Sequence, residues 1–299
     1  MIKENANTGF RFLPAWSLAL VFVLGVSISI STVASDDNQG LFSFGVVTDI
    51  QYSDKDTRGT RYYRGAMERL DESVATLNAL DLAFTIQLGD LIDGHKYALH
   101  KTRNDLERIL SVWEKLNMPK YHVIGNHCLK AGKKFLKQKL NLKKFFYDFT
   151  VPEAKGWRFL VLDGNDAGHG VLGAKQLKWL RATLRQAEDN NERVILFNHY
   201  ALLESTAKFR RMKDPQPVLA LLNQSNAVVA YFAGHDHVGG YDLHNGIHHL
   251  TVKAMVESPT DNTYATVTIY RDRLKLIGYG DEPSRDLPLA HPSPKSILR

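Results

Sequence analysis

The sequence predicts an α/β fold for one large domain. Over the first two thirds of the chain, short apolar runs typical of buried strands alternate with segments whose apolar residues repeat at helical spacing. The last third instead carries two patterns typical of β-hairpins. With 299 residues and 44% hydrophobic composition, the chain is long enough to bury such a core.

In the first half of the chain, each predicted strand runs directly into polar residues. The predicted elements are a strand over 41–48 that ends at Asp49, a helix over 67–77, a strand over 82–88 that ends at Gly89-Asp90, a helix over 106–116 and a strand over 121–124 that ends at Gly125-Asn126-His127. The order strand, helix, strand is the simplest explanation of this pattern.

The second half repeats the arrangement and then changes character. Predicted elements are a strand over 157–162, a helix over 176–184, a strand over 194–197 that ends at Asn198-His199 and a strand over 228–232 that ends at Gly234-His235-Asp236-His237. Beyond them, 241–252 and 264–278 each contain a turn sequence, at 244–246 and 271–272, and predict two hairpins.

Residues 1–34 are typical of a signal peptide or an N-terminal membrane anchor. Lys3 and Arg11 precede an apolar run over 18–30, and residues 32–34 end it with small side chains suited to cleavage. The alternative is an uncleaved anchor, because 13–30 approaches the roughly 20 residues that span a bilayer. We therefore expect an exported protein, periplasmic or secreted, or an anchored one that faces outward and contacts the membrane only through this segment.

We place a linker at 35–40, the domain at 41–280 and a tail at 281–299. The tail is rich in proline, and we expect it to be extended on the surface or disordered. We find no internal repeat in the domain.

Charge and cysteine content exclude several classes of protein. The net charge of +6 is spread over Lys and Arg residues interspersed with Asp and Glu, so we expect no specific nucleic-acid binding. Cys128 is the only cysteine, which excludes an internal disulfide framework and any cysteine-rich zinc or iron–sulfur site. We expect Cys128 to be buried packing rather than a metal ligand.

The polar clusters at the ends of five predicted strands form the main functional signal. In an α/β sheet the carboxyl ends of neighbouring strands share one edge, so side chains far apart in sequence converge there. The glycines before Asp90, Asn126 and His235 permit tight turns or close approach of the backbone. Taken singly, each Asp or His has an ordinary structural explanation; their joint register favours a metal site.

The ordered motifs Asp49-x-Gln51, Gly89-Asp90, Gly125-Asn126-His127, His199 and Gly234-His235-x-His237 resemble those of the calcineurin-like metallophosphoesterases. Gln51 stands where most of that superfamily has His. Asp-Ile-Gln-Tyr at 49–52, Arg-Tyr-Tyr-Arg at 61–64 and Gln-Leu-Gly-Asp-Leu-Ile-Asp-Gly at 87–94 are similar to the manganese-dependent ADP-ribose/CDP-alcohol diphosphatases within it. The similarity extends from Phe44 to about Leu287.

This resemblance implies a four-layer fold of two packed mixed β-sheets flanked by helices, with a binuclear metal centre. One metal would be held by Asp49, Gln51, Asp90 and His237, and the other by Asp90, Asn126, His199 and His235, with Asp90 bridging them. Such a pair of ions clamps phosphate oxygens and activates a water to hydroxide. His127 would be the catalytic residue beside the phosphate, oriented by Asp93.

We expect Mn²⁺ as the metal, with Fe, Mg²⁺ and Zn²⁺ as alternatives, because the ligands are oxygen and imidazole without thiolate. The family resemblance implies a small phosphorylated substrate, a nucleotide diphosphate derivative such as ADP-ribose or a CDP-alcohol. Arg61 and Arg64 are candidates to bind its diphosphate, and a helix start is an equally good explanation of both. Glu257 and Arg285 also resemble family positions, although surface pairing explains them as well.

Two alternatives remain open from the sequence. The same metal centre serves other phosphodiesterases and phosphomonoesterases, which a panel of substrates would separate. A non-catalytic extracytoplasmic module that binds metal or nucleotide is the alternative from another class, and the presence of His127 beside a full ligand set argues against it.

Overall fold

The computed structural model describes Gly9, residues 39–257, residue 259 and residues 261–290. Its elements in chain order are β1 (Phe42–Val47), α1 (Ala66–Asn78), β2 (Phe84–Gln87), α2 (Leu99–Trp113), β3 (Lys120–His122), the short 3₁₀ helix η1 (Cys128–Ala131), α3 (Lys133–Lys139), β4 (Tyr147–Phe149), β5 (Trp157–Val161), α4 (Ala174–Asp189), β6 (Arg193–Phe197), α5 (Gln216–Asn223), β7 (Val228–Ala233), β8 (Gly240–His244), β9 (Ile247–Thr251), η2 (Met255–Glu257), β10 (Thr263–Ile269), β11 (Arg273–Gly280) and β12 (Arg285–Pro288).

The strands form two mixed sheets, as predicted, and each sheet has six strands. The first has the order β12-β11-β10-β1-β2-β3 and the second the order β4-β5-β6-β7-β9-β8. In the first sheet β1, β2 and β3 are parallel, whereas β10 pairs with β1 in antiparallel register from Phe42↔Ile269 to Val46↔Ala265. In the second sheet β5, β6, β7 and β9 are parallel, and the hairpin and β4 supply the antiparallel edges.

An aromatic core lies between the two sheets. Phe44 on β1 stacks on Phe84 of β2 with ring centroids 4.8 Å apart, and it meets Phe197 of β6 edge to face at 5.9 Å. All three rings are fully buried. Burial of each such side chain contributes about 1.5–3 kcal/mol, so this cluster holds the sheets face to face.

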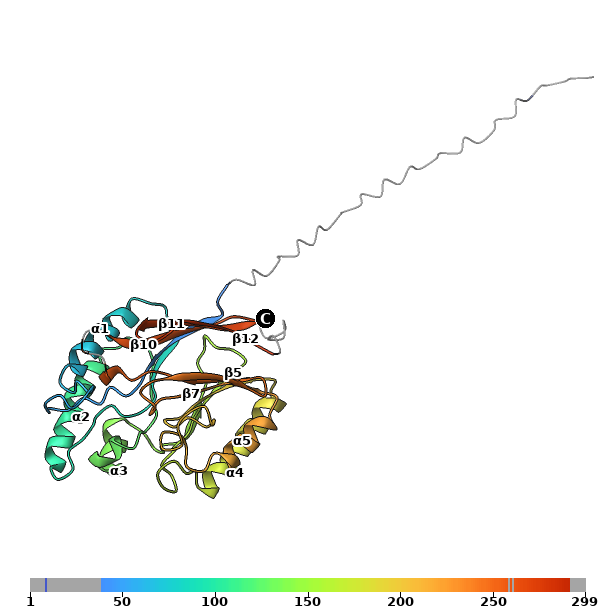
Figure 1. Cartoon of the computed structure of the whole chain (residues 1–299). Helices are drawn as coiled ribbons and strands as arrows, with labels where there is room; N and C mark the ends of the chain where they lie inside the picture. The colour runs from blue at the N-terminus through green and yellow to red at the C-terminus, as the bar shows by residue number, and fades with distance from the viewer. Residues whose placement is uncertain (1–8, 10–38, 258, 260, 291–299) are drawn as a thin grey trace, which may run out of the picture. The chain divides into compact units, whose positions relative to one another are not determined.

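Helices cover the outer face of each sheet, which completes four layers (Figure 1). Leu70 of α1 and Ile109 of α2 belong to a buried cluster with the first sheet, and Leu180 of α4 and Leu222 of α5 to one with the second. The apolar residues of each helix lie on one side because they repeat at the helical period.

The two predicted hairpins are present as β8–β9 and β10–β11. Asn245 and Gly246 form the turn of the first with φ of 52° and 75°, the left-handed pair that a tight two-residue turn requires. The short elements β4, α3 and α5 were not predicted.

The expected end of the domain at 280 is corrected by the structure. Residues 285–288 form β12 and pair with β11 at the edge of the first sheet. Leu287 and Leu289 are buried in the core between the sheets. Hydrophobic burial therefore draws the first part of the predicted tail into the domain.

Apart from Gly9, the predicted signal peptide or anchor lies outside the described residues, as do most of the linker and the segment 291–299. None of the helices in the described part of the chain has the length and apolarity needed to cross a bilayer.

Candidate metal centre

The predicted ligand residues lie at the carboxyl ends of strands, along an edge shared by both sheets. The loops after β1, β2 and β3 carry Asp49, Gln51, Asp90, Asn126 and His127, and those after β6 and β7 carry His199, His235 and His237. Two hydrogen bonds join the sheets at this edge: the His235 amide donates to Asp49 Oδ2 at 2.9 Å, and His199 Nδ1 donates to the Leu88 carbonyl at 2.9 Å. Among the predicted ligands, the first sheet thus contributes carboxylate and amide groups and the second contributes imidazoles, while His127, the predicted catalytic residue, is an imidazole from the first sheet.

Three of these side chains converge on His199 Nε2. Asn126 Oδ1, His235 Nδ1 and Asp90 Oδ2 each lie 3.2 Å from it. Within the described residues, Asp90, His199 and His235 form the group of potential ligands whose atoms all lie within 4.8 Å of one another. They match the set expected for one of the two metals.

The electrostatics of this cluster fit a cation. Asp90 Oδ2 is buried and has no hydrogen-bond partner among the residues that the structure describes. Burial of His199 opposes its protonation, but the charge of Asp90 and the contact with its carboxylate raise the pKa of His199 to about 9. Burial and the charge of His199 lower the pKa of His235 to about 3, which leaves an imidazole nitrogen for a metal.

The other predicted set surrounds Asp49. His237 Nε2 lies 3.3 Å from Asp49 Oδ1, and Gln51 Nε2 lies 3.1 Å from His237 Nε2. Gln51 Oε1 is buried without a hydrogen-bond partner in the described part of the chain. Rotation of this amide by half a turn would exchange Nε2 and Oε1. The oxygen would then face His237 and Asp49, as it would in a metal ligand.

Glu257 orients His237 from behind. Its carboxylate accepts a hydrogen bond from His237 Nδ1, which turns Nε2 toward Asp49. This bond lowers the pKa of Glu257 to about 2, and although burial opposes it, the pKa of His237 is raised to about 9 by Asp49 and Glu257. Glu257 therefore contacts a predicted ligand in addition to its ion pair with Arg61. No motif spacing identifies it as the partner of His237, because η2 brings it there from beyond the second sheet.

Four residues of the site have left-handed backbones. The φ angles are 47° at Asp49, 44° at Gln51, 53° at Asp90 and 64° at His235. For residues with a Cβ this conformation costs roughly 1–2 kcal/mol each and is typical of functional sites. In this conformation the side chains at each strand end point toward the same centre.

Two glycines permit the close approach that the sequence predicts. A Cβ on Gly125 would overlap the Asp90 carboxylate, and one on Gly234 would overlap Asp49 Oδ2. Any larger residue would push a neighbouring carboxylate out of place.

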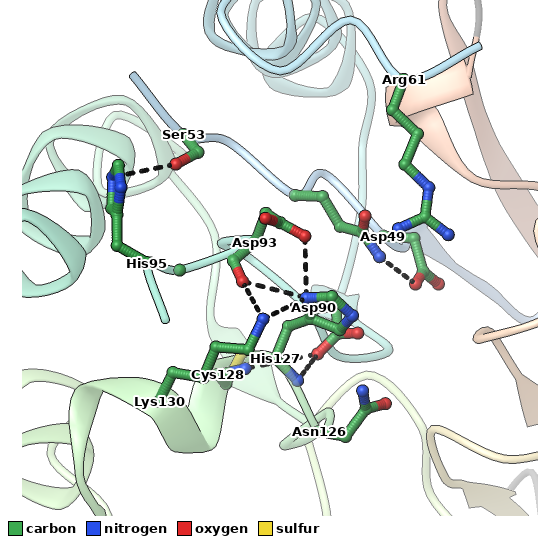
Figure 2. Close-up of polar contacts among 12 residues, drawn as sticks. Asp49, Ser53, Arg61, Asp90, Asp93, His95, Asn126, His127, Cys128 and Lys130 are labelled. Carbon is green, nitrogen blue, oxygen red and sulfur yellow. Dashed lines mark hydrogen bonds and ion pairs between the residues drawn. The ribbon is translucent and has the colours of Figure 1, made fainter. Parts of the chain in front are cut away.

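His127 and Asp93 are in contact, as expected (Figure 2). Asp93 Oδ1 lies 2.8 Å from His127 Nδ1, and the backbone amide of His127 donates to Asp90 Oδ1 at 2.8 Å. Burial opposes protonation of His127, but the charges of Asp90 and Asp93 raise its pKa. The ring is therefore held through Nδ1, with Nε2 available for a substrate.

Two lysines also contact this pair, and no motif in the sequence identifies either of them. Lys55 Nζ lies 2.5 Å from Asp93 Oδ2. Lys130 Nζ donates to the Asp93 carbonyl at 2.8 Å and lies 3.1 Å from His127 Nδ1. Figure 2 shows Lys130 pointing toward Asp93 and His127.

The two candidate arginines differ. Arg61 Nε lies 3.4 Å from Glu257 Oε1, beside the Asp49 half of the centre. Arg64 is about half exposed and pairs with Asp54 and Asp56, each at 2.6 Å. The structure therefore brings Arg61 to the site but leaves Arg64 at the surface.

Cys128 follows His127 and is fully buried. Burial raises the pKa of its thiol to about 12, so it remains protonated and packs in the core beneath the first sheet. His169, to which the sequence assigned no role, lies beside the site with its ring 5.8 Å from that of His235.

Comparison with known proteins identifies the family of this chain. The model of the family described as calcineurin-like phosphoesterase matches residues 42–239, more than half of the chain. A protein of Oryza sativa subsp. japonica named manganese-dependent ADP-ribose/CDP-alcohol diphosphatase is 30% identical and covers 85% of this chain and 96% of the rice protein. A protein of Arabidopsis thaliana with the same name is 31% identical, covering 85% and 99%.

The fold also matches a solved structure. The crystal structure of a dimetal phosphatase from Danio rerio superimposes with a TM-score of 0.76 at 23% identity, covering 84% of this chain and 100% of that one. The chain therefore belongs to the calcineurin-like phosphoesterase family, and it is a metal-dependent hydrolase of phosphate ester or anhydride bonds. The predicted family, fold and enzyme class are confirmed.

Proposed function

We propose that this calcineurin-like phosphoesterase hydrolyses the pyrophosphate bond of a small nucleotide diphosphate derivative, of the ADP-ribose or CDP-alcohol type, with Mn²⁺. The observation that carries the proposal is the convergence of Asp90, Asn126 and His235 on His199 Nε2, each at 3.2 Å. Asp90 Oδ2 is buried and accepts no hydrogen bond from the described residues, and it lies in one cluster with the imidazoles of His199 and His235. A cation bound there satisfies the carboxylate and both imidazoles.

The chain offers two neighbouring ligand sets that share Asp90. Asp90, Asn126, His199 and His235 would hold one metal, and Asp49, Gln51, Asp90 and His237 the other. When bound, two divalent ions supply charge neutralisation of the phosphate oxygens and an activated water. Glu257 and the Leu88 carbonyl keep His237 and His199 turned toward the centre.

His127 acts on the substrate rather than on the metals. Asp93 accepts from Nδ1, so Nε2 presents a proton or a lone pair to the phosphate or to its leaving group. The ring is only 20% exposed, which strengthens its interaction with charge that develops on the phosphate.

Two observations support the substrate and the metal. The relatives that match over most of both chains are named for ADP-ribose and CDP-alcohols and for manganese. The ligand set is rich in oxygen and contains no thiolate, which suits Mn²⁺ better than a soft metal.

The test is hydrolysis by metal-stripped protein resupplied with Mn²⁺. The substrates are ADP-ribose, CDP-choline, bis-p-nitrophenyl phosphate and p-nitrophenyl phosphate, with His127→Ala as the catalytic control. We expect release of AMP or CMP that requires Mn²⁺ and is lost in the control. Turnover of the synthetic esters alone would retain the reaction class and refute the substrate.

We also propose that the protein is exported or anchored facing outward. The support is the basic start and the apolar run over 18–30 within residues 1–34. The mass of the mature N-terminus after expression in a secreting host tests this. Cleavage near residue 34 supports a signal peptide, an intact membrane-bound chain supports the anchor, and an intact chain in the cytosol refutes both.

A further inference from the structure

The loops that follow β1 and β2 remain paired beyond the ends of both strands. The Gln51 amide donates to the Asp90 carbonyl at 2.8 Å. Farther along, the Asp93 amide donates to the Tyr52 carbonyl at 3.2 Å. Gln51 and Asp90 are predicted metal ligands. Since Asp93 also contacts the predicted catalytic residue His127, the register of these two loops sets the geometry of the centre.

Asp105 of α2 connects the two loops at the point where their pairing ends. From the first loop, the Ser53 hydroxyl donates to Asp105 Oδ2 at 2.7 Å, and the Asp54 amide donates to Oδ1 at 3.4 Å. From the second loop, His95 Nε2 lies 2.9 Å from the same Oδ2. Figure 2 shows Ser53 and His95 facing each other, with Oγ and Nε2 3.3 Å apart. One carboxylate therefore holds both loops against one helix.

The burial of Asp105 makes these contacts necessary for the fold. Its residue is 1% exposed, and the next residue of α2, Leu106, belongs to the buried cluster beneath the first sheet. A buried carboxylate costs stability unless hydrogen bonds compensate it. Ser53, itself fully buried, and His95 provide that compensation. Thr102, one turn earlier on α2, adds a second contact, because its Oγ1 accepts from the His95 amide at 2.8 Å.

The contacts of Asp105 lie close to the groups that hold His127. Lys55 follows Ser53 by two residues, and Asp93 precedes His95 by two residues in the other loop. Lys55 Nζ lies 2.5 Å from Asp93 Oδ2, and Asp93 Oδ1 lies 2.8 Å from His127 Nδ1. A shift of either loop at Ser53 or His95 therefore changes the position of Asp93 relative to the His127 ring.

We propose that Asp105 is a positioning residue for the reaction, which acts through Asp93 and His127 without contacting the substrate. With both loops held by Asp105, Asp93 fixes the His127 ring through Nδ1 and leaves Nε2 directed at the substrate. Without Asp105, the loops separate and Asp93 orients the ring in only a fraction of the molecules. This inference rests on the role proposed for His127 and deepens it, and it is independent of which phosphoryl compound is the substrate.

A double-mutant cycle between Asp105 and Asp93 tests the inference, because residues that act through the same group have non-additive effects. The readout is kcat of the full chain at saturating Mn²⁺, with whichever of ADP-ribose and bis-p-nitrophenyl phosphate the wild type hydrolyses faster. Asp93→Asn weakens the hold on His127 and should lower kcat by about 10-fold to 100-fold. Asp105→Ala should lower kcat by about 10-fold in the wild type and by less than about 2-fold in the Asp93→Asn background.

Two further variants separate positioning from a loss of folding. Asp105→Asn keeps an oxygen that accepts from Ser53 and His95, so it should retain most of the wild-type kcat. His95→Ala removes the contact of the second loop at a partly exposed position, so it leaves no buried site empty. It should show the same non-additivity with Asp93→Asn, and it decides the question if Asp105→Ala does not fold. Thermal unfolding of each variant identifies those that fold.

Asn78→Ala is the matched control at the other end of α2. It removes the side-chain hydrogen bonds to the Lys115 carbonyl and the Asn117 amide, in the segment that follows this helix. It should leave kcat within about 2-fold of the wild type, both alone and in the Asp93→Asn background.

The outcomes separate this inference from the proposed function. An unchanged kcat in Asp93→Asn would refute the role of His127 and, with it, the inference. A reduced kcat in Asp93→Asn would refute the inference alone if Asp105→Ala kept full activity or if the two losses multiplied in the double variant. Failure to hydrolyse ADP-ribose would refute only the proposed substrate, because the cycle is then measured with the synthetic ester.

Discussion

The two sheets meet at the metal centre with different chemistry. The edge of the first sheet contributes Asp49, Gln51, Asp90 and Asn126, which would each bind a metal through oxygen, and three of these four have left-handed backbones. The edge of the second contributes His199, His235 and His237, whose rings are fixed by acceptors behind them or by one another.

The difference shows that neither sheet contains a site on its own. Until the sheets pack, the carboxylates of the first edge are not paired with the imidazoles of the second. The centre is therefore a product of tertiary packing, and metal binding and sheet packing should stabilise each other.

Removal of one ligand from either edge should have the largest effect. Asp90→Ala and His199→Ala should each reduce kcat for any substrate by on the order of 10³-fold, because each leaves a metal without a shared or central ligand. Steady-state kinetics and metal content by mass spectrometry measure this. Asp71→Ala, which breaks only an exposed pair with Lys115, serves as control. Retention of a tenth of the activity in either variant would contradict the shared centre.

Metal removal should loosen the contact between the sheets. Mn²⁺ at about 100 times its dissociation constant stabilises the fold by about 2.7 kcal/mol, which corresponds to a Tm increase of roughly 5–10 °C for a chain of this size. Thermal unfolding of stripped and resupplied protein measures the shift. The same shift is expected in His127→Ala, which keeps all predicted ligands. An identical Tm with and without Mn²⁺ would show that the ions do not link the sheets.

Glu257→Gln should weaken one half of the centre only. Loss of the carboxylate that orients His237 is expected to raise the Mn²⁺ concentration for half-maximal activity by about 10-fold. Glu192→Gln removes a carboxylate that pairs with Arg158, far from the centre, and should leave this concentration unchanged. An unchanged metal requirement in Glu257→Gln would refute the orienting role.

His122, a histidine of the first sheet, has a structural role that distinguishes it from the ligand histidines of the second sheet. His122 of β3 is buried, and burial lowers its pKa to about 3, with a smaller contribution from Lys120. Its ring lies beside that of Trp113, and Nδ1 accepts a hydrogen bond from Gln87 Nε2 at 3.2 Å. Between pH 6.5 and 3 the unfolded chain binds a proton here that the folded chain does not, so stability falls as the pH falls, by about 1.4 kcal/mol per pH unit.

His122→Gln should remove this part of the acid sensitivity. Urea unfolding of stripped wild type and variant at several pH values between 6.5 and 4 measures the two slopes, and their difference isolates His122 from the ligand histidines. Parallel slopes would show that His122 is protonated without cost in the folded state.

Much of this architecture could be predicted because strand ends carry a local signal. Asp49 and His199 each follow a run of apolar residues long enough to define a buried strand, so their place at a sheet edge follows from the pattern. The helix α3 could not be predicted, because four of its seven residues are Lys and Leu136 is its only fully buried side chain. In β12, only Leu287 marks the strand between charged residues and proline.

The contacts around the ligands carry no such signal. Lys55 and Lys130 reach Asp93 from two different loops, and Glu257 reaches His237 across 20 residues. Arg61 and Arg64 are both candidates from the sequence because they share a motif, but Asp54 and Asp56 pair with Arg64 at the surface. Pairings of this kind depend on the packing of loops, which periodicity does not encode.

The pairing of β1 with β10 has a consequence for how the chain is made. Phe42 of β1 pairs with Ile269 of β10. The first strand to be synthesised therefore has one unpaired edge until one of the last strands has been made. Until about residue 269 has been synthesised, the full pairing of β1 with β10 cannot form. The Asp49 loop also needs the chain to have reached Met255 and Val256, whose amides donate to the carbonyls of Thr48 and Asp49. A nascent chain with this topology therefore completes its first sheet, and the Asp49 half of the metal centre, only near the end of synthesis, whereas all strands of the second sheet are available earlier.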